Sequence, residues 1–258
     1  VRREYNQWVA NQTLEDYALR FTAKRARRFG AWQVSMTALG ATAFMALEAI
    51  GGAITLSYGF TNAAVAILMV GVVIFVTGCP ITYYAAKHGV DIDLLTRGAG
   101  FGYMGSTITS LIYATFTFIF FAIEAAILAL ALKALFHIPL AIGYVICALA
   151  VVPIVTHGIT AISRFQLGSQ SMWLVLQLVA LAAVFLFEMD RLGDWRQFAG
   201  TEAPGSTGFD LALFGAASAV MFALVAQIGE QVDYLRFLPP KESVPRGQWW
   251  GAMLLAGP

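Results

Sequence analysis

Long stretches of this chain carry almost no charge, and that feature limits what the chain can fold into more than any other. Residues 34–86 hold one formal charge, Glu48, and residues 98–132 hold only Glu124. Three further windows hold none: 134–163, 165–187 and 211–229. Charged residues make up 12% of the 258 residues, about half the share usual in soluble domains. So little charge cannot cover a soluble globule of this size, and we predict an all-α integral membrane protein.

The apolar windows are long enough for six membrane crossings. A helix needs about 20 apolar residues to cross the hydrocarbon core, and its backbone polar groups must be satisfied within the segment. The first window accommodates two crossings, with a polar break at residues 57–62. The predicted spans are 33–56, 63–86, 105–132, 138–156, 169–187 and 211–231. A seventh begins at Gln248, Trp249 and Trp250, whose aromatic rings suit a membrane interface, and the chain stops at Pro258. We therefore expect the native protein to be longer.

The basic residues give an orientation. With the N-terminus inside, thirteen of the 16 Lys and Arg residues lie in cytoplasmic segments, and only Lys133, Arg191 and Arg196 lie outside. Short cytoplasmic loops are enriched in Lys and Arg. We predict a multi-pass protein of the inner (cytoplasmic) membrane, with a cytoplasmic juxtamembrane segment at 1–32 and a transmembrane domain at 33–258. The net charge of +1 excludes a nucleic-acid partner that is bound through a basic surface.

Three carboxylates, Glu48, Glu124 and Glu230, lie within the predicted spans. Such residues usually face a cavity, pair with a partner or stay protonated, and the alternative is that each is a neutral packing group. Glu48 precedes Gly51 and Gly52, which weaken a helix, and Glu-Ala-Ile-Gly at 48–51 resembles Ala-Gln-Ile-Gly at 226–229. Secondary transporters repeat a helical unit in inverted orientation and interrupt its first helix near mid-membrane. We predict such interruptions in spans one and six, at these glycines; small-residue helix packing is the alternative.

Aromatic residues and an acid share one face of span three. Phe116, Phe120 and Glu124 follow one another at intervals of four residues, so their side chains lie along the same side of a helix. A ring beside an acid suits a planar ligand that forms hydrogen bonds. The alternative is that the rings pack against lipid or other helices.

Nothing in the sequence indicates an enzyme. The three histidines, His88, His137 and His157, are scattered near span ends and lack metal-ligand spacing. No nucleophile has a plausible base. We predict no catalytic residue, no metal and no cofactor other than a coupling cation.

Three segments resemble the nucleobase:cation symporter-1 family, to which cytosine, allantoin and hydantoin permeases belong. Lys87-His88-Gly89 is followed by Leu-x-Arg at 95–97 and Phe-Gly-x-x-Gly-Ser at 101–106, and the pattern resembles that family's loop between spans two and three. Asp-x-x-Arg-Phe at 233–237 resembles the end of its span six. The glycine pair at 51–52 matches a pair in the first helix of some members.

The resemblance implies a LeuT-type inverted-repeat transporter fold that works by alternating access. This chain would hold the first five-helix repeat and the start of the second, with helix eight beyond it. The substrate would lie among helices one, three, six and eight, with Phe120 as a stacking platform. Together with the acids, we expect substrate contacts at Glu48, Gly51, Gly52, Phe120, Glu124, Phe222 and Gln227, coupling at Glu48 and Glu124, and a cytoplasmic gate at Arg97, Asp233 and Arg236.

Two functions follow from these observations. Glu48 and Glu124 stand where typical family members have small or neutral polar residues, which favours proton coupling or a ligand with an amino or cationic group. We predict a secondary active transporter of a nucleobase-like or related small polar nitrogen compound, coupled to H⁺ or Na⁺. In the alternative, residues 5–17 resemble the start of transporter-like membrane domains fused to bacterial sensor histidine kinases. The chain would then be a ligand-sensing input module whose partner is a fused or downstream kinase domain.

Overall fold

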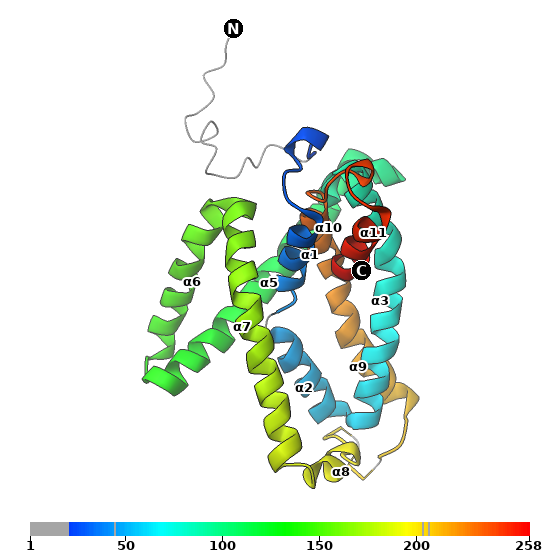
Figure 1. The fold of residues 1–258 in the computed structure, drawn as a ribbon. Coiled ribbons are helices and arrows are strands. Elements are labelled where there is room, and N and C mark those ends of the chain that lie inside the picture. The colour runs from blue at the N-terminus through cyan, green and yellow to red at the C-terminus, as the bar shows by residue number, and fades with distance from the viewer. Residues whose placement is uncertain (1–20, 44, 203, 206) are drawn as a thin grey trace.

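The chain is all-helical over the residues that the computed structural model describes, which are 21–43, 45–202, 204–205 and 207–258. An isolated bridge between Phe21 and Val90 is the only β-type pairing among them. The all-α prediction is confirmed (Figure 1). Residues 5–17, which carry the resemblance to sensor-kinase input domains, lie outside the described residues, as does most of the predicted juxtamembrane segment 1–32.

The helices follow the predicted spans in order. Span one corresponds to α1 and α2, span three lies within α5, and span six corresponds to α9, η3 and α10. Their bounds are α1 Ala31–Gly40, α2 Ala46–Tyr58, α3 Phe60–His88, α4 Ile92–Thr96, η2 Arg97–Phe101, α5 Gly102–Phe136, α6 Leu140–Thr156, α7 Gly158–Phe187, α8 Arg191–Arg196, α9 Leu211–Phe222, η3 Ala223–Ala226, α10 Gln227–Leu235 and α11 Arg246–Ala256, with short turns η1 Lys24–Ala26 and η4 Lys241–Ser243.

Within the part of the chain that the structure describes, four helical segments are long and apolar enough to cross a membrane. They are 60–88, 92–136, 158–187 and 211–235. Helix α6 is apolar but has 17 residues, and span one is divided into helices of 10 and 13 residues. The helices therefore suit a multi-pass membrane protein. The side of the membrane on which each loop lies stays a prediction.

The interruption of span one does not lie at the predicted glycines. Helix α2 winds without a break through Gly51 and Gly52, whereas the chain leaves helical form between Gly40 and Ala46. In an apolar surrounding, a helix that bonds its own peptide groups is favoured even where glycine occurs. Thr55 Oγ1 also donates to the Gly51 carbonyl oxygen at 2.7 Å. The predicted position was wrong by about two to three helical turns.

Span six is one continuous helical segment, 211–235, and only its α winding is interrupted, just before the predicted position. Residues 223–226 form the tighter turn η3, and Gly229 lies inside α10. Gly229 serves packing instead: a Cβ there would lie 3.0 Å from the ring of Tyr113 on α5. The missing side chain lets these two helices approach closely.

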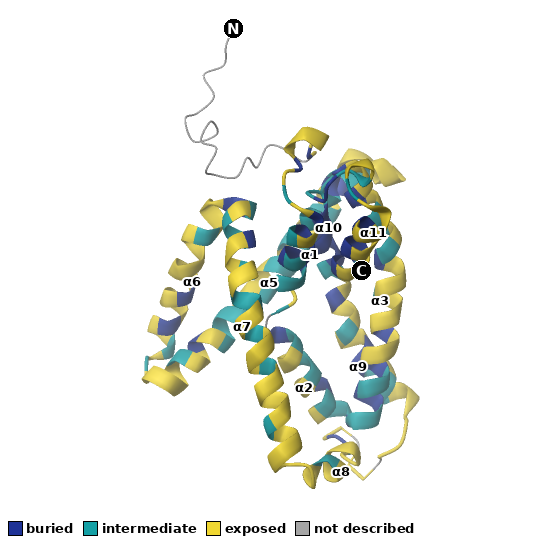
Figure 2. Ribbon diagram, in the orientation of Figure 1, coloured by how far each residue is buried: buried dark blue, intermediate teal, exposed yellow. Residues whose placement is uncertain are grey.

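The most buried residues gather at one end of the molecule, where α1, α3, α10 and α11 meet (Figure 2). Trp249 is fully buried there and donates from Nε1 to the Pro239 carbonyl oxygen at 3.0 Å. The ring of Trp249 is therefore part of the protein core, and its depth in the membrane stays a prediction. Helix α6 packs beside α5 and α7, and α7 returns against α1. The cavity described next lies between α5 and the start of α7 on one side and α10 and the end of α1 on the other.

Candidate functional site

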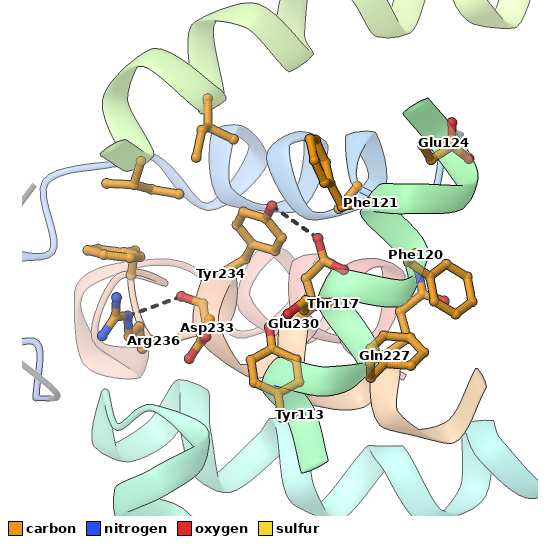
Figure 3. Close-up of a pocket in the computed structure, with 15 residues that line it drawn as sticks. Tyr113, Thr117, Phe120, Phe121, Glu124, Gln227, Glu230, Asp233, Tyr234 and Arg236 are labelled. Atoms are coloured by element: carbon orange, nitrogen blue, oxygen red, sulfur yellow. Dashed lines mark hydrogen bonds between the residues drawn. The ribbon is translucent and has the colours of Figure 1, made fainter. Parts of the chain in front are cut away.

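A cavity of about 410 Å³ lies beside the middle of α5 (Figure 3). Its walls come from α5, the start of α7, α10 and the turn that follows each of α1 and α10. The lining residues are Ala41, Tyr113, Phe116, Thr117, Phe120, Phe121, Glu124, Ile159, Ile162, Gln227, Glu230, Asp233, Tyr234, Arg236 and Phe237. Both interrupted spans therefore contribute, through Ala41 next to α1 and Gln227 next to η3.

Helix α5 supplies the aromatic wall. Phe116, Phe120 and Glu124 all line the cavity, as their spacing on one helical face predicted. The rings of Phe116 and Phe120 have centroids 4.4 Å apart and are tilted by 38°. A planar group in the cavity would lie against these rings, because offset and tilted aromatic contacts are favourable.

Glu124 joins α5 to the interruption in span one. Its Oε1 accepts a hydrogen bond from the backbone nitrogen of Ala46 at 2.6 Å. Ala46 is the first residue of α2 and is fully buried. The first amides of a helix have no partner within it, and a negative charge there is favoured by the helix dipole. The carboxylate of α5 thus caps the N-terminus of α2.

Helix α10 supplies the polar wall. Gln227, Glu230 and Tyr234 lie three to four residues apart and all reach the cavity. The hydroxyl of Tyr234 donates to Glu230 Oε1 at 3.4 Å. The side-chain nitrogen of Gln227 is buried and has no hydrogen-bond partner among the described residues. An acceptor on a ligand would satisfy this donor, since a buried donor left without a partner is costly.

The predicted gate residues are separated. Arg236 and Asp233 line the cavity, and Arg236 Nε donates to the Asp233 backbone oxygen at 3.2 Å. The Arg236 guanidinium carbon also lies 4.9 Å from the centroid of the Phe237 ring. Arg97 instead pairs with Asp93 at 2.9 Å and donates to Ser106, and it does not line the cavity. These contacts fix the turn between α4 and α5, and a gate role for Arg97 stays a prediction.

Four predicted substrate residues lie outside this cavity. Glu48 is exposed and accepts a hydrogen bond from Gln177 of α7 at 2.8 Å. Gly51 and Gly52 line a different hollow, of about 570 Å³, beside α8. Phe222 is 42% exposed. Because both interruptions come earlier than expected, the glycine face of α2 and the end of α9 lie outside this cavity, and the roles expected of these four residues stay predictions.

Several lining residues were missing from the predicted site. Glu230 was among the three carboxylates in the predicted spans but was not assigned to the substrate site. Tyr113, Thr117 and Tyr234 were not selected. The spacing of Gln227, Glu230 and Tyr234 was the available signal, since residues three and four apart share a helical face.

The chain matches no protein-family model, no curated protein and no solved structure. The geometry of the cavity is therefore what bears on function.

Proposed function

We propose that this chain forms the binding core of a secondary transporter for a small polar nitrogen compound, of nucleobase-like size and shape. One observation carries the proposal: a cavity with polar and aromatic walls adjoins the break in span one, at Ala41, and the tighter turn η3 of span six, at Gln227. Substrate sites of secondary transporters typically lie where spanning helices are discontinuous.

The positions of the interruptions support an inverted repeat. Counting crossings along the chain, spans one and six run in opposite directions. Each is divided unequally, by the break between α1 and α2 in one and by the tighter turn at 223–226 in the other. We propose on this basis a LeuT-type arrangement, in which the two interrupted spans are equivalent members of two repeats. The resemblance to nucleobase:cation symporters points the same way.

The residues suggest how a ligand is held. A planar ring would stack on Phe116 and Phe120, whose centroids are 4.4 Å apart. A carbonyl or ring nitrogen of the ligand would accept from Gln227, and ligand N–H groups would donate to Glu230. Alternating access would then follow from movement at the two interruptions, where few backbone hydrogen bonds must change. Coupling to H⁺ or Na⁺ would use the cavity carboxylates, and the N-terminus would be cytoplasmic.

Uptake by proteoliposomes tests the proposal. The full-length protein is reconstituted and supplied with labelled purines, pyrimidines and related cyclic amides, with an imposed H⁺ or Na⁺ gradient. We expect gradient-dependent accumulation of at least one compound. Gln227→Leu should reduce it at least about tenfold, the effect of one lost hydrogen bond to a buried donor together with altered packing. Gln170→Leu is the matched control, because Gln170 lies on α7 and outside the cavity lining.

Two results would contradict the proposal. Absence of gradient-dependent uptake by folded protein would remove the transport function, and binding without uptake would favour a sensor. An equal loss of uptake in Gln227→Leu and Gln170→Leu would show that the cavity is not the substrate site.

A further inference from the structure

The charges that line the cavity are unbalanced. Glu124, Glu230 and Asp233 contribute three carboxylates, and Arg236 contributes one guanidinium. Figure 3 shows Arg236 and Asp233 at one end of the cavity, Glu124 at the other and Glu230 between them. The single cation is therefore placed beside Asp233, where its Nε donates to the backbone oxygen, and away from Glu124.

Glu230 has capacity for a ligand. Its Oε1 receives the hydroxyl of Tyr234 at 3.4 Å, a long hydrogen bond. Among the described residues, no hydrogen bond is made to the other carboxylate oxygen of Glu230, Oε2. A carboxylate within a membrane-spanning helix needs a compensating partner or a proton. A ligand cation with two N–H groups would supply that partner in the two-pronged geometry that carboxylates favour.

The aromatic wall favours a cation that is also flat. The faces of Phe116 and Phe120 carry partial negative charge, which attracts a cation lying over the ring. A planar cation stacks on such rings and presents its N–H groups at its edge, toward the carboxylates. The buried, unpartnered side-chain nitrogen of Gln227, which Figure 3 shows beside Phe120, is a donor, so an acceptor elsewhere on such a ligand would satisfy it and the cationic group would not.

We propose that the cavity takes a planar organic cation of the amidinium or guanidinium type, held between Glu230 and the Phe116–Phe120 pair. This inference rests on the proposed function, because it assigns the substrate class of the same cavity. Such a ligand differs from a neutral nucleobase in its positive charge, which balances the excess of carboxylates in the lining.

A matched pair of probes tests the charge alone. Benzamidine and benzamide have nearly the same size and shape, but benzamidine is a cation at neutral pH and benzamide is neutral. Binding of each to the purified full-length protein in detergent is measured by calorimetry. We expect benzamidine to bind at least about tenfold more tightly, since hydrogen bonds between charged partners add about one to two factors of ten. Equal binding of the two, or no binding of benzamidine at millimolar concentration, would overturn the inference.

Two variants locate the effect. Glu230→Gln should weaken benzamidine binding about tenfold or more and leave benzamide binding within about threefold. Glu48→Gln removes an intramembrane carboxylate outside the cavity and should leave both unchanged. A loss of benzamidine affinity in Glu48→Gln that equals the loss in Glu230→Gln would overturn the inference. If Glu230→Gln does not fold, the comparison of the two probes on the unaltered protein still decides.

The outcomes separate the two proposals. Gradient-driven uptake of a neutral heterocycle without benzamidine preference would overturn the cationic class and leave transport standing. Benzamidine preference without uptake of any compound would support the cationic class and remove transport.

Discussion

Replacing Glu124 by alanine removes the cap that α5 provides to α2. Glu124 Oε1 accepts from the Ala46 amide at 2.6 Å, and Ala46 is fully buried. The substitution therefore leaves a buried donor at a helix N-terminus with no acceptor. Glu124→Gln has nearly the same shape and keeps a carbonyl oxygen in place of the carboxylate oxygen.

The expected loss of stability can be worked from these contacts. Removing a capping oxygen costs about 1 kcal/mol, a charge at a helix end contributes about 0.3–1 kcal/mol, and an unsatisfied buried amide costs about 1–3 kcal/mol. These contributions overlap, so we expect Glu124→Ala to lower the free energy of unfolding by about 2–3 kcal/mol. Glu124→Gln loses only the charge, and we expect about 0.5–1 kcal/mol.

Thermal unfolding in detergent, followed with a thiol-reactive dye, measures the difference. Cys147 on α6 is 2% exposed, so its thiol reacts only after the helices separate; Cys79, which is only partly buried, is replaced by serine in every variant compared. At roughly 2–4 °C per kcal/mol for a chain of this size, Glu124→Ala should lower Tm by about 4–12 °C. Glu48→Ala is the control, because Glu48 is exposed and its partner is the side chain of Gln177. We expect it to lower Tm by less than about 3 °C.

The capping explanation fails if Glu124→Ala and Glu48→Ala lower Tm equally. It also fails if Glu124→Gln is as damaging as Glu124→Ala, because the retained oxygen would then contribute nothing.

Three further substitutions follow from the packing. Gly229→Ala places a Cβ 3.0 Å from an aromatic ring and should cost about 1–3 kcal/mol, whereas Gly215→Ala meets open space and should be neutral or stabilising in the same thermal assay. Phe120→Leu removes half of a ring pair and should weaken benzamidine binding about threefold to tenfold by calorimetry, while Phe118→Leu, on the exposed face of α5, should not change it. Asp93→Ala breaks an ion pair whose carboxylate is 8% exposed and should lower the free energy of unfolding by about 1–3 kcal/mol; its partner is one-third exposed, so the cost is below that of a fully buried pair.

The helices were predictable because the bilayer imposes them. A chain without charge over 20 residues has no alternative to self-bonded helix in lipid, and the break expected at 57–62 is confirmed at Gly59, between α2 and α3. Gly59 has a φ of 81°, which favours glycine. The face shared by Phe116, Phe120 and Glu124 was predictable for a similar reason, since helical periodicity is local.

The interruptions were not predictable in position, because distant contacts decide them. The start of α2 is set by an acceptor on α5, and no short-range pattern contains that information. A shift of a few residues in where α2 begins was enough to move Glu48 out of the site. Sequence alone could not assign Glu230 to the site, because Arg236 is near enough in sequence to be its partner. In the structure the guanidinium of Arg236 instead lies over the Phe237 ring, at one end of the cavity.

The Ala46–Glu124 bond spans 78 residues of sequence, and this has a consequence for biosynthesis. At a translation rate of about 5–20 residues per second, the ribosome adds the acceptor roughly 4–16 s after the donor. Until then α1 and α2 are joined without the hydrogen bond from Ala46 to Glu124 that fixes their junction. In nascent chains that stop before residue 124, the position of α2 relative to α1 should therefore be poorly fixed. Addition of α5 up to Glu124 should fix it.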